Sequence, residues 1–180
     1  MAIMGRTFSN KVRFGRSIPK FVSVRSRNQG AQQTDSTTHV INLPEAQVGD
    51  VIYVAFSIDT ATTVTSTTST GWAKLASDKQ GTSTNQTGEV WWKRATGSDA
   101  FTITSSTAEQ STHVSLAIAN ADDPEAVTAN GAAAAAAVPP AINASRGTEN
   151  YLCLVSTHTD SSAGTTQNFG AISGFDVSTT

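Results

Sequence analysis

Cysteine and long apolar stretches are both scarce in this sequence of 180 residues. The single cysteine, Cys153, cannot form a disulfide within the chain, which excludes a disulfide-stapled scaffold. No apolar stretch approaches the roughly 20 residues that a membrane-spanning helix requires. The basic N-terminus also lacks the apolar stretch and cleavage site of a signal peptide. The sequence therefore indicates neither membrane insertion nor export by a signal peptide.

Patterns that mark catalytic or metal centres are missing too. The histidines have none of the H-x-H or H-x-x-x-H spacings that zinc sites use; there are three, His39, His113 and His158. No G-x-S-x-G elbow accompanies the many serines, so no serine nucleophile is indicated. The acidic stretch 122–125 lacks the alternation and the glycine of an EF-hand loop, which favours a solvated turn. We expect no catalytic residue, no metal, no cofactor and no enzyme activity.

Hydroxyl side chains are what the sequence has in abundance. It contains 27 Thr and 21 Ser, whereas charged residues make up only 14%. Thr, Val and Ile suit a pleated, half-buried surface, so this composition favours strands and turns over helices. Short alternating or apolar runs separated by turn residues are typical of an antiparallel sandwich or barrel. We expect strands near 38–43, 50–58, 61–67, 72–77, 88–95, 99–105, 112–119 and 150–157.

Turn residues support this all-β prediction. Val48-Gly49-Asp50 precedes an apolar run, and Thr96-Gly97-Ser98-Asp99 predicts a hairpin between the runs on either side of it. Residues 78–87 have no apolar side chain and are expected to form an exposed loop, and 121–149 an irregular connector. Cys153 lies between two leucines, which predicts a buried, unreactive thiol in a strand. The fold predicted for 37–180 is an antiparallel β-sandwich, jelly-roll or Ig-like, possibly incomplete at its C-terminus.

Charge divides the chain into two parts. Residues 1–27 contain seven basic residues and no acid, whereas 28–180 contain five basic residues and all 14 acids. Seven cations are compatible with nucleic-acid binding, but apolar residues interleave with them, which better fits a segment that docks on an acidic protein surface. We therefore predict an anchoring arm over 1–36. Its partner-binding residues are Arg6, Lys11, Arg13, Phe14, Arg16, Lys20, Phe21, Val24, Arg25 and Arg27.

Trp91 and Trp92 are adjacent in a predicted strand, so their side chains point to opposite faces. One of them is expected in the core, while the other faces outward, where it packs on a neighbouring subunit or meets a glycan. The sequence does not determine which is buried, because a shift of one residue in register exchanges the two faces.

A succession of motifs resembles the virion-associated β-sandwich domains of phages and prophages, which occur in head-fibre, decoration and tail-associated proteins. These motifs are Val48-Gly49-Asp50-Val51-Ile52, Gly71-Trp72, Val90-Trp91-Trp92-Lys93-Arg94, Val114-Ser115-Leu116-Ala117-Ile118 and Asp122-Asp123-Pro124. Over roughly 38–157, this resemblance implies a virion component with no catalytic residues to transfer.

The function expected from the sequence is thus that of a phage structural protein, attached by its arm as a capsid decoration or head-fibre protein at the surface of the virion. Its expected partners are capsid or tail shell proteins and further copies of itself, rather than nucleic acid or a membrane. Two alternatives stay open: a tail fibre or adaptor component, and a glycan-binding module that uses Trp91 or Trp92 on host polysaccharide.

Overall fold

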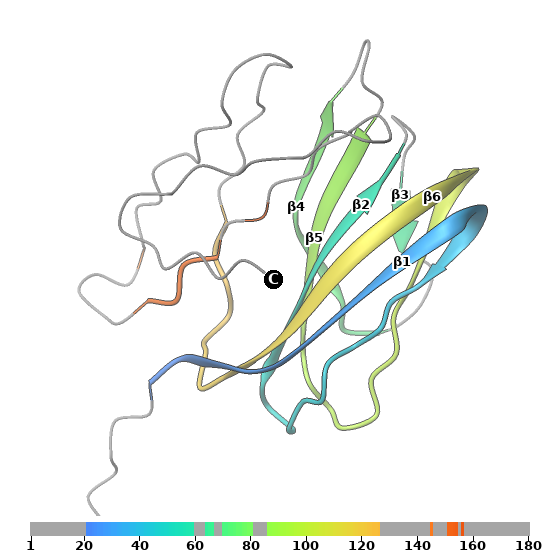
Figure 1. Cartoon of the computed structure of the whole chain (residues 1–180). Helices are drawn as coiled ribbons and strands as arrows, with labels where there is room; N and C mark the ends of the chain where they lie inside the picture. The colour runs from blue at the N-terminus through green and yellow to red at the C-terminus, as the bar shows by residue number, and fades with distance from the viewer. Residues whose placement is uncertain are drawn as a thin grey trace, which may run out of the picture.

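The described part of the chain is an antiparallel β structure without a helix (Figure 1). This computed structural model describes residues 21–59, 64–66, 70–80, 86–126, 145, 151–154 and 156. One sheet has the strand order β1-β6-β2-β5-β4, and the short β3 pairs with β6. The strands are β1 Ser23–Val40, β2 Val51–Ile58, β3 Val64–Ser66, β4 Ala73–Gln80, β5 Gln86–Arg94 and β6 Thr102–Ala119.

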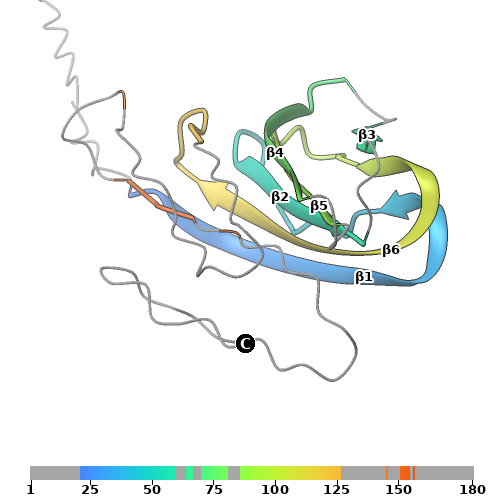
Figure 2. The same ribbon diagram turned by 90° about the horizontal axis from the view of Figure 1, so that it is seen from above.

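The two longest strands, β1 and β6, bend together. Residues 23–32 of β1 pair with 111–119 of β6, and after register shifts on both sides of Ser36 the pairing resumes between 38–40 and 102–104. Figure 2 shows both strands curling so that these ends turn back over the sheet. β3 pairs with the same part of β6, at Ser105 to Ile103. We call 36–40, 64–66 and 102–107 the returned layer, and the rest of the sheet the main sheet.

The hydrophobic core lies between the returned layer and the main sheet. The alternation in β2 places Ile52, Val54, Phe56 and Ile58 on one face, each at most 1% exposed. Burial of such side chains is the principal force that holds the two layers together. Their partners in the core include Ile41, Trp91, Ala95, Phe101 and Ile103.

Phe101 is the aromatic centre of this core. Its ring stacks on Trp72 with centroids 4.1 Å apart and meets the edge of Trp91 at 5.5 Å. The indole N–H of Trp72 donates to the backbone oxygen of Ala100 at 3.2 Å, which fixes the ring at the rim of the core. Phe101 follows the turn after β5 and precedes β6. This turn therefore carries the chain from the main sheet toward the returned layer and places the Phe101 side chain in the core between them.

The predicted hairpin at 96–99 is wrong, because the strands on either side of this turn do not pair with each other. β5 lies between β2 and β4, whereas β6 pairs with β1, β2 and β3, so the strands before and after this turn are not neighbours. The turn itself forms as expected: the carboxylate of Asp99 accepts the backbone N–H of Thr96 at 2.8 Å, and Gly97 has a φ of 96°. It links two layers instead of two paired strands.

The sheet also begins earlier than the sequence indicated. The predicted arm ran to residue 36, but residues 23–36 belong to β1, and residues 1–20 lie outside the described residues. β1 is an edge strand with polar side chains on both faces, so it lacks the apolar alternation by which strands are recognised. The predicted strands 99–105 and 112–119 both overlap one continuous strand, β6, which begins at Thr102.

Two further predictions differ from the structure. The predicted loop 78–87 overlaps two strands: residues 78–80 end β4 and residues 86–87 begin β5, while 81–85 lie outside the described residues. The side-chain amide of Gln86 donates to Ser57 Oγ at 2.6 Å. Cys153 is exposed, and residues 151–154 are not in a strand. Of the flanking leucines, Leu152 is exposed and Leu154 is half-buried, so this apolar run is not in the core.

Replacing Phe56 with Ala is expected to lower the free energy of unfolding by about 3–5 kcal/mol, because it leaves a cavity where the two layers meet. Val114→Ala, at a side chain that is 44% exposed on β6, is the matched control and should cost less than about 1 kcal/mol. Urea denaturation of both variants measures the difference. Equal losses would contradict the placement of the core.

Candidate functional site

The predicted arm residues fall into two groups. Arg6, Lys11, Arg13, Phe14, Arg16 and Lys20 lie outside the described residues. Phe21 and Val24 are exposed by 65% and 44%, and Arg27 is exposed as well. The start of β1 therefore presents apolar and basic side chains to the outside.

Arg25 is used within the chain. Its Nε donates to Asp50 Oδ2 at 2.6 Å and its Nη2 to Asp50 Oδ1 at 3.2 Å. Asp50 also accepts the backbone N–H of Gln47 at 3.0 Å, inside the turn where Gly49 has a φ of 92°. The Arg25 guanidinium holds the pKa of Asp50 below its usual value. This pair fixes the entry to β2 against β1, so Arg25 is engaged in the fold.

Trp91 is the buried member of the tryptophan pair, at 7% exposure. Its indole N–H donates to Glu89 Oε2 at 2.8 Å, and the ammonium of Lys74 lies 4.8 Å from the ring centroid. Lys74 also forms an ion pair with Glu89, whose side chain is 2% exposed. Burial raises the pKa of Glu89 despite the opposing effects of Lys74 and Trp91. Trp91 is thus a core residue beside a buried charge.

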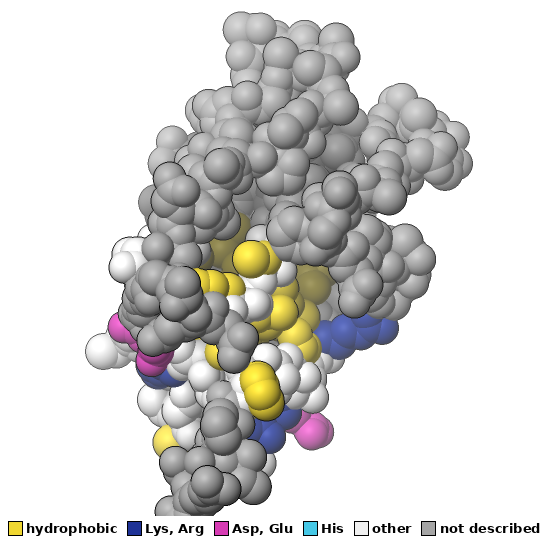
Figure 3. All heavy atoms as spheres, turned by 90° about the vertical axis from the view of Figure 1, so that its left-hand side faces the viewer, with side chains coloured by type: hydrophobic (Ala, Val, Ile, Leu, Met, Phe, Trp, Pro, Cys, Tyr) yellow, Lys and Arg dark blue, Asp and Glu magenta, His cyan; other side chains and the backbone are white. Residues whose placement is uncertain are grey.

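Trp92 lies on the opposite surface of the main sheet, which we call the outer face. There it is half-buried and in register with Tyr53, which is in turn in register with Leu116. The Tyr53 side chain shares a hydrogen bond with Ser156, so the C-terminal part of the chain reaches this face, and burial raises the pKa of Tyr53. Figure 3 shows hydrophobic side chains gathered on one side of the molecule, with basic and acidic ones at the border.

A buried polar cluster joins the returned layer to the main sheet. We call it the His–Ser seam: His39, Ser105, Ser111, His113 and Ser115, all at most 7% exposed. His39 contacts Ser111 Oγ through Nδ1 at 2.8 Å and Ser105 Oγ through Nε2 at 3.1 Å. His113 Nε2 accepts the backbone N–H of Asn42 at 2.9 Å, and Ser115 Oγ donates to the Asn42 backbone oxygen at 2.6 Å.

The seam resembles a nucleophile and base only in composition. Both nitrogens of His39 face serine hydroxyls, where a catalytic triad has a carboxylate on one side. His39, Ser105 and Ser111 are also buried, so their hydrogen bonds are structural contacts. The other two members of the seam, His113 and Ser115, bind the backbone N–H and C=O of Asn42, which lies outside any strand and has no ladder partner there. Burial lowers the pKa of both His39 and His113.

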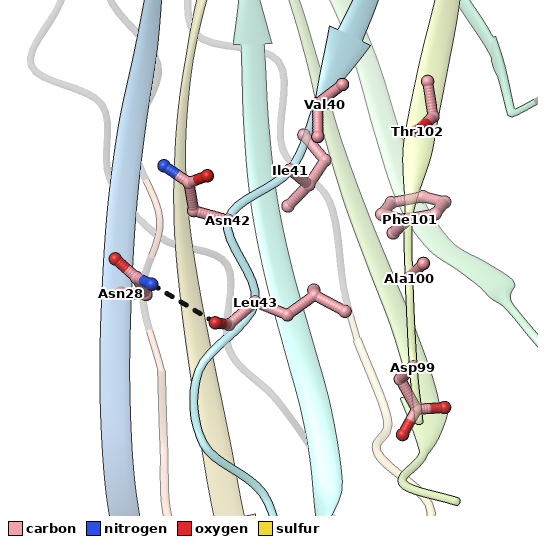
Figure 4. Close-up of a pocket in the computed structure, with 9 residues that line it drawn as sticks. All are labelled: Asn28, Val40, Ile41, Asn42, Leu43, Asp99, Ala100, Phe101 and Thr102. Atoms are coloured by element: carbon pink, nitrogen blue, oxygen red, sulfur yellow. Dashed lines mark hydrogen bonds between the residues drawn. The ribbon is translucent and has the colours of Figure 1, made fainter. Parts of the chain in front are cut away.

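A shallow groove of about 400 Å³ lies beside the seam (Figure 4). The segment 40–43 runs between β1 and the residues around Phe101, and Asn28 donates to the Leu43 backbone oxygen at 3.2 Å. The only ionisable side chain among the lining residues is Asp99, which is paired with Lys93 at 2.6 Å. The groove offers amides and apolar carbons to a ligand.

Within the described ranges, no three His, Cys, Asp or Glu side chains are grouped as metal ligands would be. No helix in this part of the chain is long and apolar enough to cross a membrane. Neither family models, nor curated proteins, nor solved structures give a significant match to this chain.

The sequence reasoning missed the seam. The spacing of the histidines carries no metal-site signal, and the informative pattern is the period-two run Ser111, His113, Ser115 in a strand. That run puts three polar side chains on one face of the strand. Polar side chains on a buried face indicate that they form hydrogen bonds there, in this case with the backbone of Asn42 and with His39. Nothing in the local sequence links it to Asn42 or to His39, more than 60 residues away.

Glu89→Gln is expected to change how stability depends on pH. Because the pKa of Glu89 is raised in the folded state, this group contributes its full stability below its unfolded value near 4.5 and loses it as pH rises through the folded value. Thus the wild-type free energy of unfolding, minus that of the variant, should fall between pH 4 and pH 7. Denaturant titrations across this range measure the difference. A flat or rising difference would contradict the buried carboxylate.

Proposed function

We propose that this chain is a non-enzymatic structural protein of a bacteriophage-like particle, located on the particle surface as a capsid decoration or head-fibre protein. The observation that carries the proposal is charge asymmetry: residues 1–20 have five basic residues and no acid, whereas 28–180 have 14 acids and five bases. The basic segment joins the body at β1, an edge strand of the sheet. An edge connection leaves such a segment able to reach another protein.

The partner-binding part of the proposal is narrower than residues 1–36. β1 starts at Ser23, and Arg25 is paired with Asp50, so both support the body. The proposed contacts to capsid or tail shell proteins are therefore the cations and Phe14 of 1–20, continued by the exposed Phe21 and Val24. Apolar anchors among cations suit an acidic, grooved protein surface better than a nucleic acid.

The body itself we propose to be an antiparallel β-sandwich of the jelly-roll or Ig-like kind that forms homo-oligomers. The returned layer supports this, because it packs a second set of strands over the core of the main sheet. Proteins that build particles commonly use such β scaffolds. The buried residues of the His–Ser seam are engaged with backbone and with each other, which suits a structural role.

The tail fibre or adaptor role is the alternative within the same class. The glycan-binding alternative now depends on Trp92, since the Trp91 ring is in the core. Trp92 and Tyr53 are register partners on the outer face, an arrangement that offers aromatic surface to a sugar ring. A glycan array with the full chain and with Trp92→Ala separates this alternative from a structural role.

Deleting residues 2–20 is expected to abolish incorporation of the chain into particles while the sheet still folds, because Ser23 and the Arg25–Asp50 pair remain. Immunoblots of purified particles measure incorporation, and circular dichroism checks the fold. A second variant with Arg6, Lys11, Arg13, Arg16 and Lys20 changed to Gln tests the charges alone. Its matched control changes Thr7, Ser9, Asn10 and Ser17 to Ala. Full incorporation of the truncated, folded chain would overturn the anchoring role.

A further inference from the structure

We propose that the His–Ser seam is an acid-sensitive latch: protonation of His39 and His113 releases the returned layer and residues 41–46 from the main sheet. This inference concerns the fold and holds whether or not the chain is a virion component. It starts from where the hydrogen bonds lie. His39 is on the returned layer and Ser111 on the main sheet, while His113 and Ser115 on the main sheet hold the backbone of Asn42. Each of these bonds joins the parts that the latch would separate.

The protons of the seam can be assigned around neutral rings. Ser105 Oγ donates to the Thr107 backbone oxygen at 2.6 Å, so it accepts from His39 Nε2–H. That leaves Nδ1 of His39 with a lone pair for the hydroxyl of Ser111. His113 Nε2 is an acceptor as well, because its partner is a backbone N–H, which cannot turn away. A proton on His113 Nε2 would place two hydrogens between nitrogens 2.9 Å apart.

The residues that border His39 and His113 offer few interactions that could stabilise a protonated imidazole. The Phe56 ring lies 5.4 Å from His39 and is the register partner of His113, and on the other side His113 faces Gly30. A Cβ on Gly30 would come within 2.5 Å of the imidazole, so any larger residue there would force the side chains of His113 and Asn42 to shift. Apolar carbon thus borders both imidazoles, and burial lowers the pKa of each.

The charged groups around the seam lie farther off or are already engaged. Glu89 of β5 follows Phe56 in the same register row and is held by Lys74 and Trp91. Asp35 is exposed and Glu109 half-buried where β1 and β6 bend, and Asp59 follows the end of β2, with its backbone N–H bonded to the backbone oxygen of Gln110. A ring that gains a proton inside the seam therefore reaches a better environment by moving out to these acids and to water.

The sign of the pH effect follows from the neutral rings. A histidine whose folded pKa lies below 6.5 contributes full stability above pH 6.5 and loses it as pH falls through that value toward the folded one. Each ring then raises the opening constant by up to about tenfold per pH unit. The Arg25–Asp50 pair keeps its charge down to a lower pH, since the pKa of Asp50 lies below 3.8. The turn at 47–50 therefore stays in place while the latch opens.

Amide hydrogen exchange of the full chain at pH 7.5 and pH 5.0, corrected for the chemical exchange rate, tests the latch. Protection at Asn42, whose N–H is bonded to His113 across the latch, should fall at least about tenfold more than at Val54 in the middle of the main sheet. An equal fall at both amides would mean global acid destabilisation, and no fall at Asn42 would mean that the rings do not titrate. Both outcomes overturn the latch.

Neutral substitutions give the matched test. Gln keeps an acceptor for the Asn42 N–H at position 113 and both a donor and an acceptor at position 39, but carries no charge. His39→Gln/His113→Gln should retain at pH 5.0 the protection it has at pH 7.5, whereas the control His158→Gln should lose protection as the wild type does. If the double variant fails to fold, His113→Gln alone should recover at least part of the lost protection; unchanged acid opening in that variant would contradict the latch.

Discussion

The structure depends on the bend that β1 and β6 make together. Without it, the face of β2 that carries Ile52, Val54, Phe56 and Ile58 would lie open to water, because the described strands of the main sheet all lie side by side in one layer. The bend brings Phe101, Ile103 and Ile41 over that face and closes the core. The register shifts on both sides of Ser36 interrupt the pairing of β1 with β6 where the two strands bend, because bulges let paired strands turn sharply.

The same bend leaves backbone N–H and C=O groups without strand partners, and the seam binds those of Asn42. The chain leaves β1 at Val40 and continues toward β2 without strand pairing over 42–46, so its backbone groups need other partners. His113 and Ser115 supply them from the inner face of β6, and His39 ties the returned part of β1 to Ser111. The buried His and Ser side chains of the seam are thus a consequence of the path that the chain takes between β1 and β2. A charge on either ring removes the match between these donors and acceptors.

The all-β fold, the strand near β2 and the turn at 48–50 follow from local sequence, because alternation and turn residues act over a few positions. Only the end of β1, residues 38–40, lies in a predicted strand. The rest was missed because an edge strand with polar residues on both faces has no alternating pattern, and its pairing with β6 is a contact between distant segments. The hairpin at 96–99 was predicted from turn chemistry, which determines where the chain turns but leaves open which strand it joins. Trp91 and Trp92 were separated correctly by face, and only the register assigned Trp91 to the core.

At the level of function, the account rests on a basic segment attached to the edge of an acidic β body. The most direct measurement is electron cryo-microscopy of the proposed phage-like particle, with attention to the density of residues 1–20. The account predicts that this density lies in a groove of a capsid or tail shell protein, with the sheet projecting outward. Density of residues 1–20 against packaged nucleic acid, or the absence of the chain from particles, would contradict it.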